Sequence, residues 1–131
     1  MKYTAILLII WALTCSNCNT VKPAKIIVVT FSEEKQKTIT VHKGDTLLIK
    51  LRMASGTGYV WEVISADTSL CKQGDTKYEY IKKRMPGAPL IEVISFSILA
   101  KGEEDISFIF HRPFEKNTAP AKIKTLHLIV Q

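Results

Sequence analysis

Apolar and polar residues alternate with a period of two through nearly the whole of this chain of 131 residues. Successive side chains of a strand point to opposite faces of a sheet, so the alternation indicates strands with one buried face. No window carries apolar residues at positions i, i+3, i+4 and i+7 over three turns, as an amphipathic helix would. The pattern therefore predicts an all-β fold.

Eight segments carry this alternation, and residues that favour turns separate them. The predicted strands are Lys25–Phe31, Thr38–Val41, Thr46–Met53, Tyr59–Ser65, Lys77–Lys82, Leu90–Ala100, Asp105–His111 and Ile123–Val130. Their apolar rows are expected to form the core: Leu47, Ile49 and Leu51; Ile94, Phe96 and Ile98; Ile106, Phe108 and Phe110; Leu126, Leu128 and Val130. Seven to eight short strands of this kind favour an immunoglobulin-like β-sandwich, with a closed barrel as the alternative.

The first twenty residues have the composition of a secretory signal. Lys2 supplies a positive start, Ala5–Leu13 an apolar stretch, and Thr14–Ser16 a small-residue segment suited to a signal peptidase. The apolar stretch is shorter than the roughly 20 residues that a membrane-spanning helix needs. We expect residues 1–20 to be a signal peptide, either cleaved or of the lipoprotein type.

Residues 21–131 are long enough to bury the core of one domain without metals or disulfides. We expect this domain to be exported, which leaves the medium, a periplasm or a vesicle lumen as its location. A lipid anchor at Cys15 or Cys18 remains an alternative to cleavage. We expect no membrane span and a monomer.

The net charge of +6 does not indicate a nucleic-acid binder, because basic residues are interleaved with acidic ones rather than gathered in a stripe. The spacing of histidines, cysteines and carboxylates matches no metal site, and no glycine loop precedes a helix that would bind phosphate. The paired carboxylates Glu103 and Glu104 are expected to be solvated at a turn. The sequence predicts no cofactor.

Cys71 is the one cysteine well inside the expected domain, and three histidines raise the question of a Cys/His hydrolase. Cys71 lies in a polar stretch that leads into a predicted turn at Gly74 and Asp75. No helix follows whose N-terminus would lower the thiol pKa. We therefore expect an exposed or half-buried thiol, no catalytic residues, and a chain that is not an enzyme.

Three connecting segments combine small, proline and aromatic residues. The first loop consists of Ala54, Ser55, Gly56, Thr57 and Gly58 and leads into Tyr59-Val60-Trp61; the second runs through Met85, Pro86, Gly87, Ala88 and Pro89; the third begins with Arg112, Pro113, Phe114 and Glu115. Glycine and proline make such loops thin and stiff, although each one taken singly is also an ordinary turn.

Taken in order, these elements resemble the chagasin-type inhibitors of cysteine peptidases, over most of the chain after residue 20. That family carries a loop written Asn-Pro-Thr-Thr-Gly followed by an aromatic, one other residue and Trp. A Gly-x-Gly-Gly loop and an Arg-Pro-Trp or Arg-Pro-Phe element follow. The resemblance implies an immunoglobulin-like fold and a reversible, tight-binding inhibitor of papain-like, cathepsin L-like cysteine proteases.

The first loop matches the family pattern only at Thr57 and Gly58. Ala54, Ser55 and Gly56 stand in place of the Asn, the Pro and the first Thr. The loss of the proline is expected to remove some rigidity, and the loss of Asn and Thr removes polar contacts.

The other two loops differ in how well they match. In the second loop Gly87 and Ala88 fit the start of the pattern, whereas Pro89 and Leu90 replace two glycines, and Leu90 is expected to add bulk where close backbone approach is needed. The third motif matches fully, at Arg112, Pro113 and Phe114.

The resemblance implies that all three loops enter the protease cleft and cover its catalytic Cys and His. It assigns Thr57 to the position nearest the catalytic centre and Phe114 to packing against a wall of the enzyme. Arg112 would donate a hydrogen bond to the enzyme or stack on it; alternatively, it pairs with Glu115 or braces the neighbouring loop. Tyr59 and Trp61 are expected to support the loop base. The alternative function is an exported immunoglobulin-like adhesion or envelope binding module without inhibitory activity.

Overall fold

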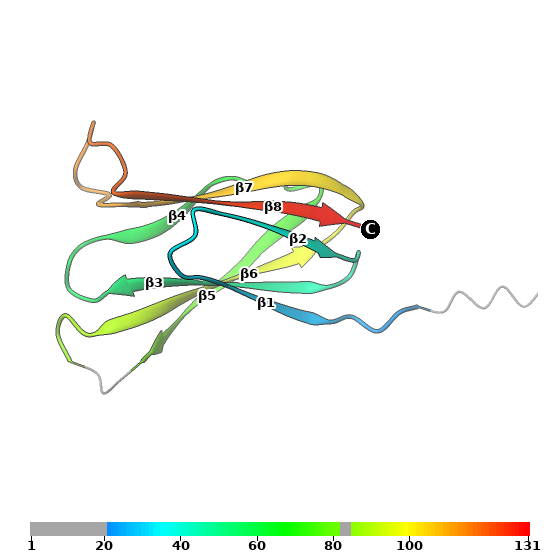
Figure 1. Cartoon of the computed structure of the whole chain (residues 1–131), viewed down its shortest axis with the longest axis horizontal. Coiled ribbons are helices and arrows are strands. Elements are labelled where there is room, and N and C mark those ends of the chain that lie inside the picture. Colours follow the sequence, from blue (N-terminus) through cyan, green and yellow to red (C-terminus); the bar gives the residue numbers. More distant parts are fainter. Residues whose placement is uncertain (1–20, 82–84) are drawn as a thin grey trace, which may run out of the picture.

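The computed structural model describes residues 21–81 and 85–131 as eight strands in two layers (Figure 1). The strands are β1 (Ile26–Phe31), β2 (Gln36–Val41), β3 (Thr46–Ala54), β4 (Val60–Ser65), β5 (Cys71–Tyr80), β6 (Pro89–Ile98), β7 (Gly102–His111) and β8 (Lys122–Val130). The predicted signal peptide, with Cys15 and Cys18, lies outside the described residues, as do residues 82–84. Within the described ranges no helix has the length and hydropathy of a membrane span.

Each layer is a four-stranded sheet, one in the order β1-β3-β6-β5 and the other in the order β2-β8-β7-β4. β1 pairs in parallel with β3, and β2 pairs in parallel with β8, while the other four pairs are antiparallel. The chain therefore changes sheet between β1 and β2. The predicted immunoglobulin-like sandwich is confirmed, and the closed barrel is wrong because the described strands form two separate sheets.

The inward rows of the two sheets form one apolar core, as the alternation predicted. Phe108 lies at its centre, with ring centroids 6.1 Å from Phe31 and 6.3 Å from Phe96. Eleven of the twelve predicted core residues are buried, whereas Phe110 is half-buried. Phe110 differs because it lies near the end of β7, where the sandwich opens toward the loops.

The fifth strand is longer than predicted. It was expected over Lys77–Lys82 after a turn at Gly74 and Asp75, but β5 begins at Cys71 and carries those two residues within it. A register shift between Gln73 and Thr76 accommodates them as a bulge, and Ser95 Oγ on β6 donates to the Asp75 carbonyl at 2.9 Å. Pairing with the long β6 thus overrides the local turn preference of Gly-Asp.

The expectation for Cys71 is also wrong, because its side chain is fully buried at the start of β5. Its Sγ donates to Glu104 Oε1 at 2.8 Å, and Glu104 Oε2 accepts the Asp67 N–H at 2.5 Å. Burial, followed by the bond to Glu104, raises the pKa of the thiol to about 12. Glu104 is consequently a half-buried strand residue on β7 and not the solvated turn residue that was expected.

The three loops singled out in the sequence are the β3–β4, β5–β6 and β7–β8 connections. Figure 1 shows all three at one end of the sandwich, opposite the C-terminus and the β2–β3 turn. This follows from the antiparallel pairs: the end of β3 lies beside the start of β6, and the start of β4 lies beside the end of β7. Residues that are 35 positions apart (Ala54 and Pro89) and 51 positions apart (Val60 and His111) therefore meet at one end.

Candidate functional site

The first and second loops are joined by hydrogen bonds centred on Ser55. Its backbone N–H and its Oγ both donate to the Ala88 carbonyl, each at 3.2 Å, and Oγ also lies 3.4 Å from the Met85 carbonyl. A proline at position 55 could not make the backbone bond because it has no N–H. The serine that departs from the family pattern therefore stiffens the tip by cross-linking two loops, which offsets the expected loss of rigidity.

The glycines on either side of this link allow the two loops to approach closely. Gly56 and Gly87 adopt φ of 75° and 74°, a left-handed region that glycine enters at little cost. A Cβ at position 56 would lie 3.8 Å from the Gly87 backbone nitrogen. The two backbones run side by side at the tip, and both glycines are exposed.

The first and third loops are joined by Arg112. Its Nε donates to the Thr57 carbonyl at 3.2 Å, its NH1 pairs with Glu115 Oε1 at 2.7 Å, and its guanidinium carbon lies 4.5 Å from the centroid of the Tyr59 ring. The two structural roles considered for Arg112, pairing with Glu115 and bracing the neighbouring loop, are therefore both observed. The pairing raises the pKa of the guanidinium further, chiefly through the hydrogen bond to Glu115.

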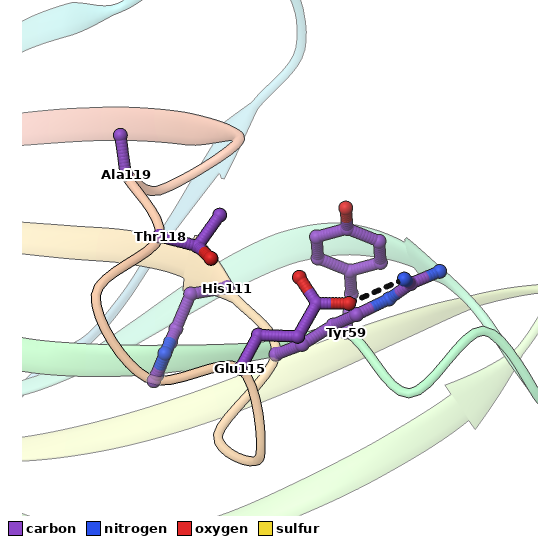
Figure 2. Close-up of a pocket in the computed structure, with 6 residues that line it drawn as sticks. Tyr59, His111, Glu115, Thr118 and Ala119 are labelled. Atoms are coloured by element: carbon purple, nitrogen blue, oxygen red, sulfur yellow. Dashed lines mark hydrogen bonds and ion pairs between the residues drawn. The ribbon is translucent and has the colours of Figure 1, made fainter.

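The stem of the third loop is closely packed around this arginine. Figure 2 shows Tyr59, His111, Glu115, Thr118 and Ala119 around a narrow crevice, with the ion pair of Glu115 drawn as a dashed line. The crevice has a volume of about 10 Å³, which is no more than the space of one water molecule. The crevice is therefore too small to bind a ligand.

Phe114 is the most exposed aromatic side chain at the tip, with 68% of its surface accessible. One edge of its ring rests on Gly58, where a Cβ would lie 2.9 Å from Phe114 Cε1. Gly58 also has φ of 76°, so position 58 requires glycine for its backbone and for the ring that covers it. The adjacent Pro113 is exposed as well.

Thr57 lies on the same exposed surface and is partly engaged within its own loop. Its Oγ1 donates to the Ala54 carbonyl at 3.0 Å and lies 3.5 Å from the Tyr59 N–H. These bonds close a small turn that holds the loop in shape. The second lone pair of the hydroxyl remains available to a partner.

An aromatic cluster supports the loops from below. Tyr59 stacks on Phe110 with ring centroids 5.0 Å apart, and Trp61 lies against the same ring at 4.8 Å. Trp61 is buried, and its Nε1 donates to the Arg52 carbonyl on the other sheet at 3.2 Å. The cluster thus ties both sheets together directly under the tip.

The inner row of β6 supplies two further residues at this end. Glu92, which sequence reasoning did not single out, is buried, and its Oε2 accepts the Trp61 N–H at 3.4 Å; burial raises the pKa of its carboxyl group. Its position two residues before Ile94 marked it as inward-facing. Leu90 also faces the core and is 5% exposed, so the prediction that it adds bulk at the tip is wrong.

The structure places the predicted residues of the first and second loops, Ala54 to Gly58 and Gly87 to Pro89, at one end with Arg112, Pro113 and Phe114. Tyr59 and Trp61 lie beneath them. In the described parts of the chain, no group of three or more His, Cys, Asp or Glu residues could hold a metal ion. The arrangement offers an exposed, cross-linked edge for contact with another molecule.

Sequence comparison decides the family. The profile of the chagasin family peptidase inhibitor I42 matches residues 40–129, a span that includes all three loops. The chain belongs to the chagasin family. Membership confirms the resemblance drawn from the loops and the expectation that the chain is not an enzyme, since members of this family inhibit peptidases.

Individual proteins that are similar to this chain match most of its length. The chain is 29% identical over 124 residues to Amoebiasin-2 of Entamoeba histolytica, across 94% of this chain and 97% of that protein. The crystal structure of the cysteine protease inhibitor EhICP2 from Entamoeba histolytica has a TM-score of 0.71 at 24% identity, over 82% of this chain and 97% of that one. PbICP-C, solved in complex with falcipain-2, has a TM-score of 0.62 at 20% identity, over 80% and 99%. These two structures share the fold of this chain.

Proposed function

We propose that this protein is a reversible, tight-binding inhibitor of papain-like, cathepsin L-like cysteine proteases and blocks their active-site cleft with its three loops. The observation that carries the proposal is the cross-linked tip, in which Ser55 joins the first loop to the second and Arg112 joins the first to the third. Family membership and the naming of EhICP2 as a cysteine protease inhibitor support it, and PbICP-C in complex with falcipain-2 offers a parallel.

A pre-formed tip favours tight binding for a physical reason. Association costs free energy when loops must be ordered, and loops already held by hydrogen bonds and stacked rings lose little further freedom. The exposed Phe114 supplies an aromatic anchor, the kind of residue that often dominates interface energetics. The same rigidity would hinder cleavage, because a protease must draw its substrate into an extended conformation.

Within this proposal Thr57 and Gly58 sit nearest the catalytic Cys and His of the enzyme. Phe114 packs against an apolar wall of the cleft on one side, and Gly87 to Pro89 contact the other side. Arg112 acts mainly by holding the first loop in position, because its guanidinium is already bonded to the Thr57 carbonyl and to Glu115. Its stacked face and remaining N–H groups would supplement this role with a contact to the enzyme.

The test is a titration of residues 21–131 against papain and a cathepsin L-like protease, following hydrolysis of a fluorogenic peptide. A double variant, Phe114→Ala with Thr57→Ala, is measured alongside, with folding checked by circular dichroism. We expect reversible inhibition that the double variant weakens at least tenfold, which is about 1.4 kcal/mol. A folded protein that inhibits neither enzyme at micromolar concentration would contradict the proposal and favour the binding-module alternative.

We also propose that the chain is exported, on the strength of Lys2 and the apolar stretch Ala5–Leu13. N-terminal sequencing of the protein recovered from its source would test this. A mature N-terminus near residue 21, or a lipid on Cys15 or Cys18, is expected. An intact N-terminus beginning at Met1 or Lys2 would contradict it.

A further inference from the structure

A groove of about 670 Å³ lies behind the loop tips, along β3 of one sheet and the start of β8 of the other. Its volume falls within the range of roughly 300 to 1,000 Å³ that is usual for ligand sites. Part of its lining is apolar and aromatic, contributed by Phe31, Met53, Trp61 and Phe110. The aromatic cluster beneath the loops therefore also forms one wall of this groove.

The polar lining of the groove is predominantly basic. Five cationic residues line it, together with one acidic residue, Glu33. The cationic residues are Lys50, Arg52, Arg112, Lys122 and Lys124. Such an excess of one sign of charge in a concave site with low-dielectric walls concentrates the electrostatic potential and attracts the opposite charge.

Three of these cations already have partners within the protein. Lys50 pairs with Glu79 at 2.7 Å, and Arg112 pairs with Glu115 at 2.7 Å. Lys124 is buried and donates to the Ser32 and Glu34 carbonyls, both at 2.8 Å. These residues hold the groove in shape more than they offer charge to a ligand.

Arg52 and Lys122 are different, because both are exposed and neither takes part in an ion pair among residues 21–81 and 85–131. Lys122 Nζ lies 5.9 Å from the centroid of the Phe110 ring, which forms part of the apolar wall. Lys122 also helps to lower the pKa of Lys124, after the larger effect of burial. An anion in the groove would relieve this repulsion between like charges.

The groove is continuous with the tip, because Thr57, Gly87 and Arg112 line it as well. A molecule bound to the tip would lie alongside the open mouth of the groove. The occupant that the charges fit is thus a part of that same partner.

We propose that the groove docks an acidic segment of the target protease, an aspartate or glutamate with a neighbouring apolar side chain, located beside the active-site cleft. Arg52 and Lys122 supply the positive charge for the carboxylate, and the partly buried Met53 and Phe110 receive the apolar group. This proposal rests on the proposed inhibition and adds a basis for choosing among proteases with similar catalytic centres. It predicts that association is steered by charge and is sensitive to ionic strength.

The test uses the double charge reversal Arg52→Glu with Lys122→Glu. Its matched control is Lys43→Glu with Lys101→Glu, which makes the same change in net charge at two exposed lysines at the opposite end of the sandwich. Association rates with an acidic cathepsin L-like protease are measured by stopped-flow at ionic strengths from about 20 to 300 mM. The milder pair Arg52→Gln with Lys122→Gln provides a second reading if the reversal fails to fold.

We expect the groove reversal to slow association at least about tenfold at low salt and to flatten its salt dependence, with an intermediate effect for the glutamine pair. The control pair should change the rate by less than about threefold, because its charges lie far from the interface.

Equal rates for the groove and control variants, with inhibition intact, would overturn the groove proposal alone. Absence of inhibition by the wild-type protein would overturn both proposals. Saturable binding of dodecanoate, with protease association unaffected by charge reversal, would assign the groove to a small lipid and would also overturn it.

Discussion

Arg112 Nε donates to the Thr57 carbonyl at 3.2 Å, and this bond joins the third loop to the first. The two residues are separated by 55 positions in the sequence. Because the Glu115 carboxylate holds the other side of the same guanidinium at 2.7 Å, the arginine cannot swing away without breaking an ion pair. The geometry of the tip therefore depends on the planar, forked shape of this side chain.

We predict that Arg112→Lys weakens inhibition about tenfold while leaving the unfolding midpoint nearly unchanged, because an ammonium cannot bond both partners in the same plane. The measurement is the inhibition constant alongside a thermal melt. Glu115→Gln serves as the comparison, since it leaves the bond to Thr57 in place and should have a smaller effect. Inhibition by Arg112→Lys as strong as that of the wild type would show that the bond does not matter.

We predict that Gly58→Ala and Gly44→Ala destabilise the fold similarly, by about 1 to 2 kcal/mol, because both positions have positive φ. Only Gly58→Ala should impair inhibition, since its Cβ would meet the Phe114 ring at 2.9 Å, whereas nothing lies within 4 Å at position 44. Urea unfolding and inhibition assays on both variants separate the two effects. Equal inhibition by the two variants would contradict the placement of Phe114.

We predict that Cys71 does not react with a thiol reagent at pH 8 in the folded protein. The thiol is buried and its pKa is raised to about 12, so roughly one molecule in ten thousand would carry the thiolate at that pH. Labelling should become fast in 6 M urea. Complete labelling within minutes in the native state would show that the start of β5 is open.

We predict that Asp45 contributes stability that is lost in acid. Its carboxylate accepts the His42 N–H at 2.9 Å and the Lys25 N–H at 3.1 Å, and these bonds lower its pKa in the folded state. A carboxyl group with a lowered folded pKa stabilises above its unfolded pKa of about 3.9, and the contribution disappears as pH falls through the folded pKa.

The urea midpoint of the wild type should therefore fall more steeply between pH 6 and pH 2 than that of Asp45→Asn. Asn keeps the size of the side chain and removes its titration. Parallel pH profiles for the two proteins would contradict this role for Asp45.

The alternation of residues was sufficient to predict an all-β fold and its core rows, because inward positions such as Phe96 and Phe108 are fixed by a period of two regardless of the order of the strands. The choice of a sandwich over a closed barrel needed the pairing of the strands into two sheets. The order itself, including the parallel pairing of β1 with β3, depends on contacts between distant segments that a local pattern does not contain. For the same reason the local pattern predicts a turn at Gly74, where pairing with β6 instead produces a bulge.

The candidate site could be predicted as a set of loops but not as a linked unit. The Arg-Pro-Phe element and Gly58 were visible in the sequence, whereas the bond from Ser55 to Ala88 was not, because it joins loops about 30 residues apart. Leu90 was misjudged because its neighbour Pro89 belongs to the tip, while Leu90 already faces the core as the next residue of β6. One step along a strand reverses the side on which a side chain lies.

The most direct test of the central claim is amide hydrogen exchange of the protein alone and in complex with a cathepsin L-like protease. Insertion of the three loops predicts slower exchange in the complex at Gly56–Gly58, Gly87 and Phe114, with no change at the Lys43–Gly44 turn at the opposite end. Inhibition accompanied by unchanged exchange in the loops, or by protection at the opposite end, would contradict the claim that this tip occupies the protease cleft.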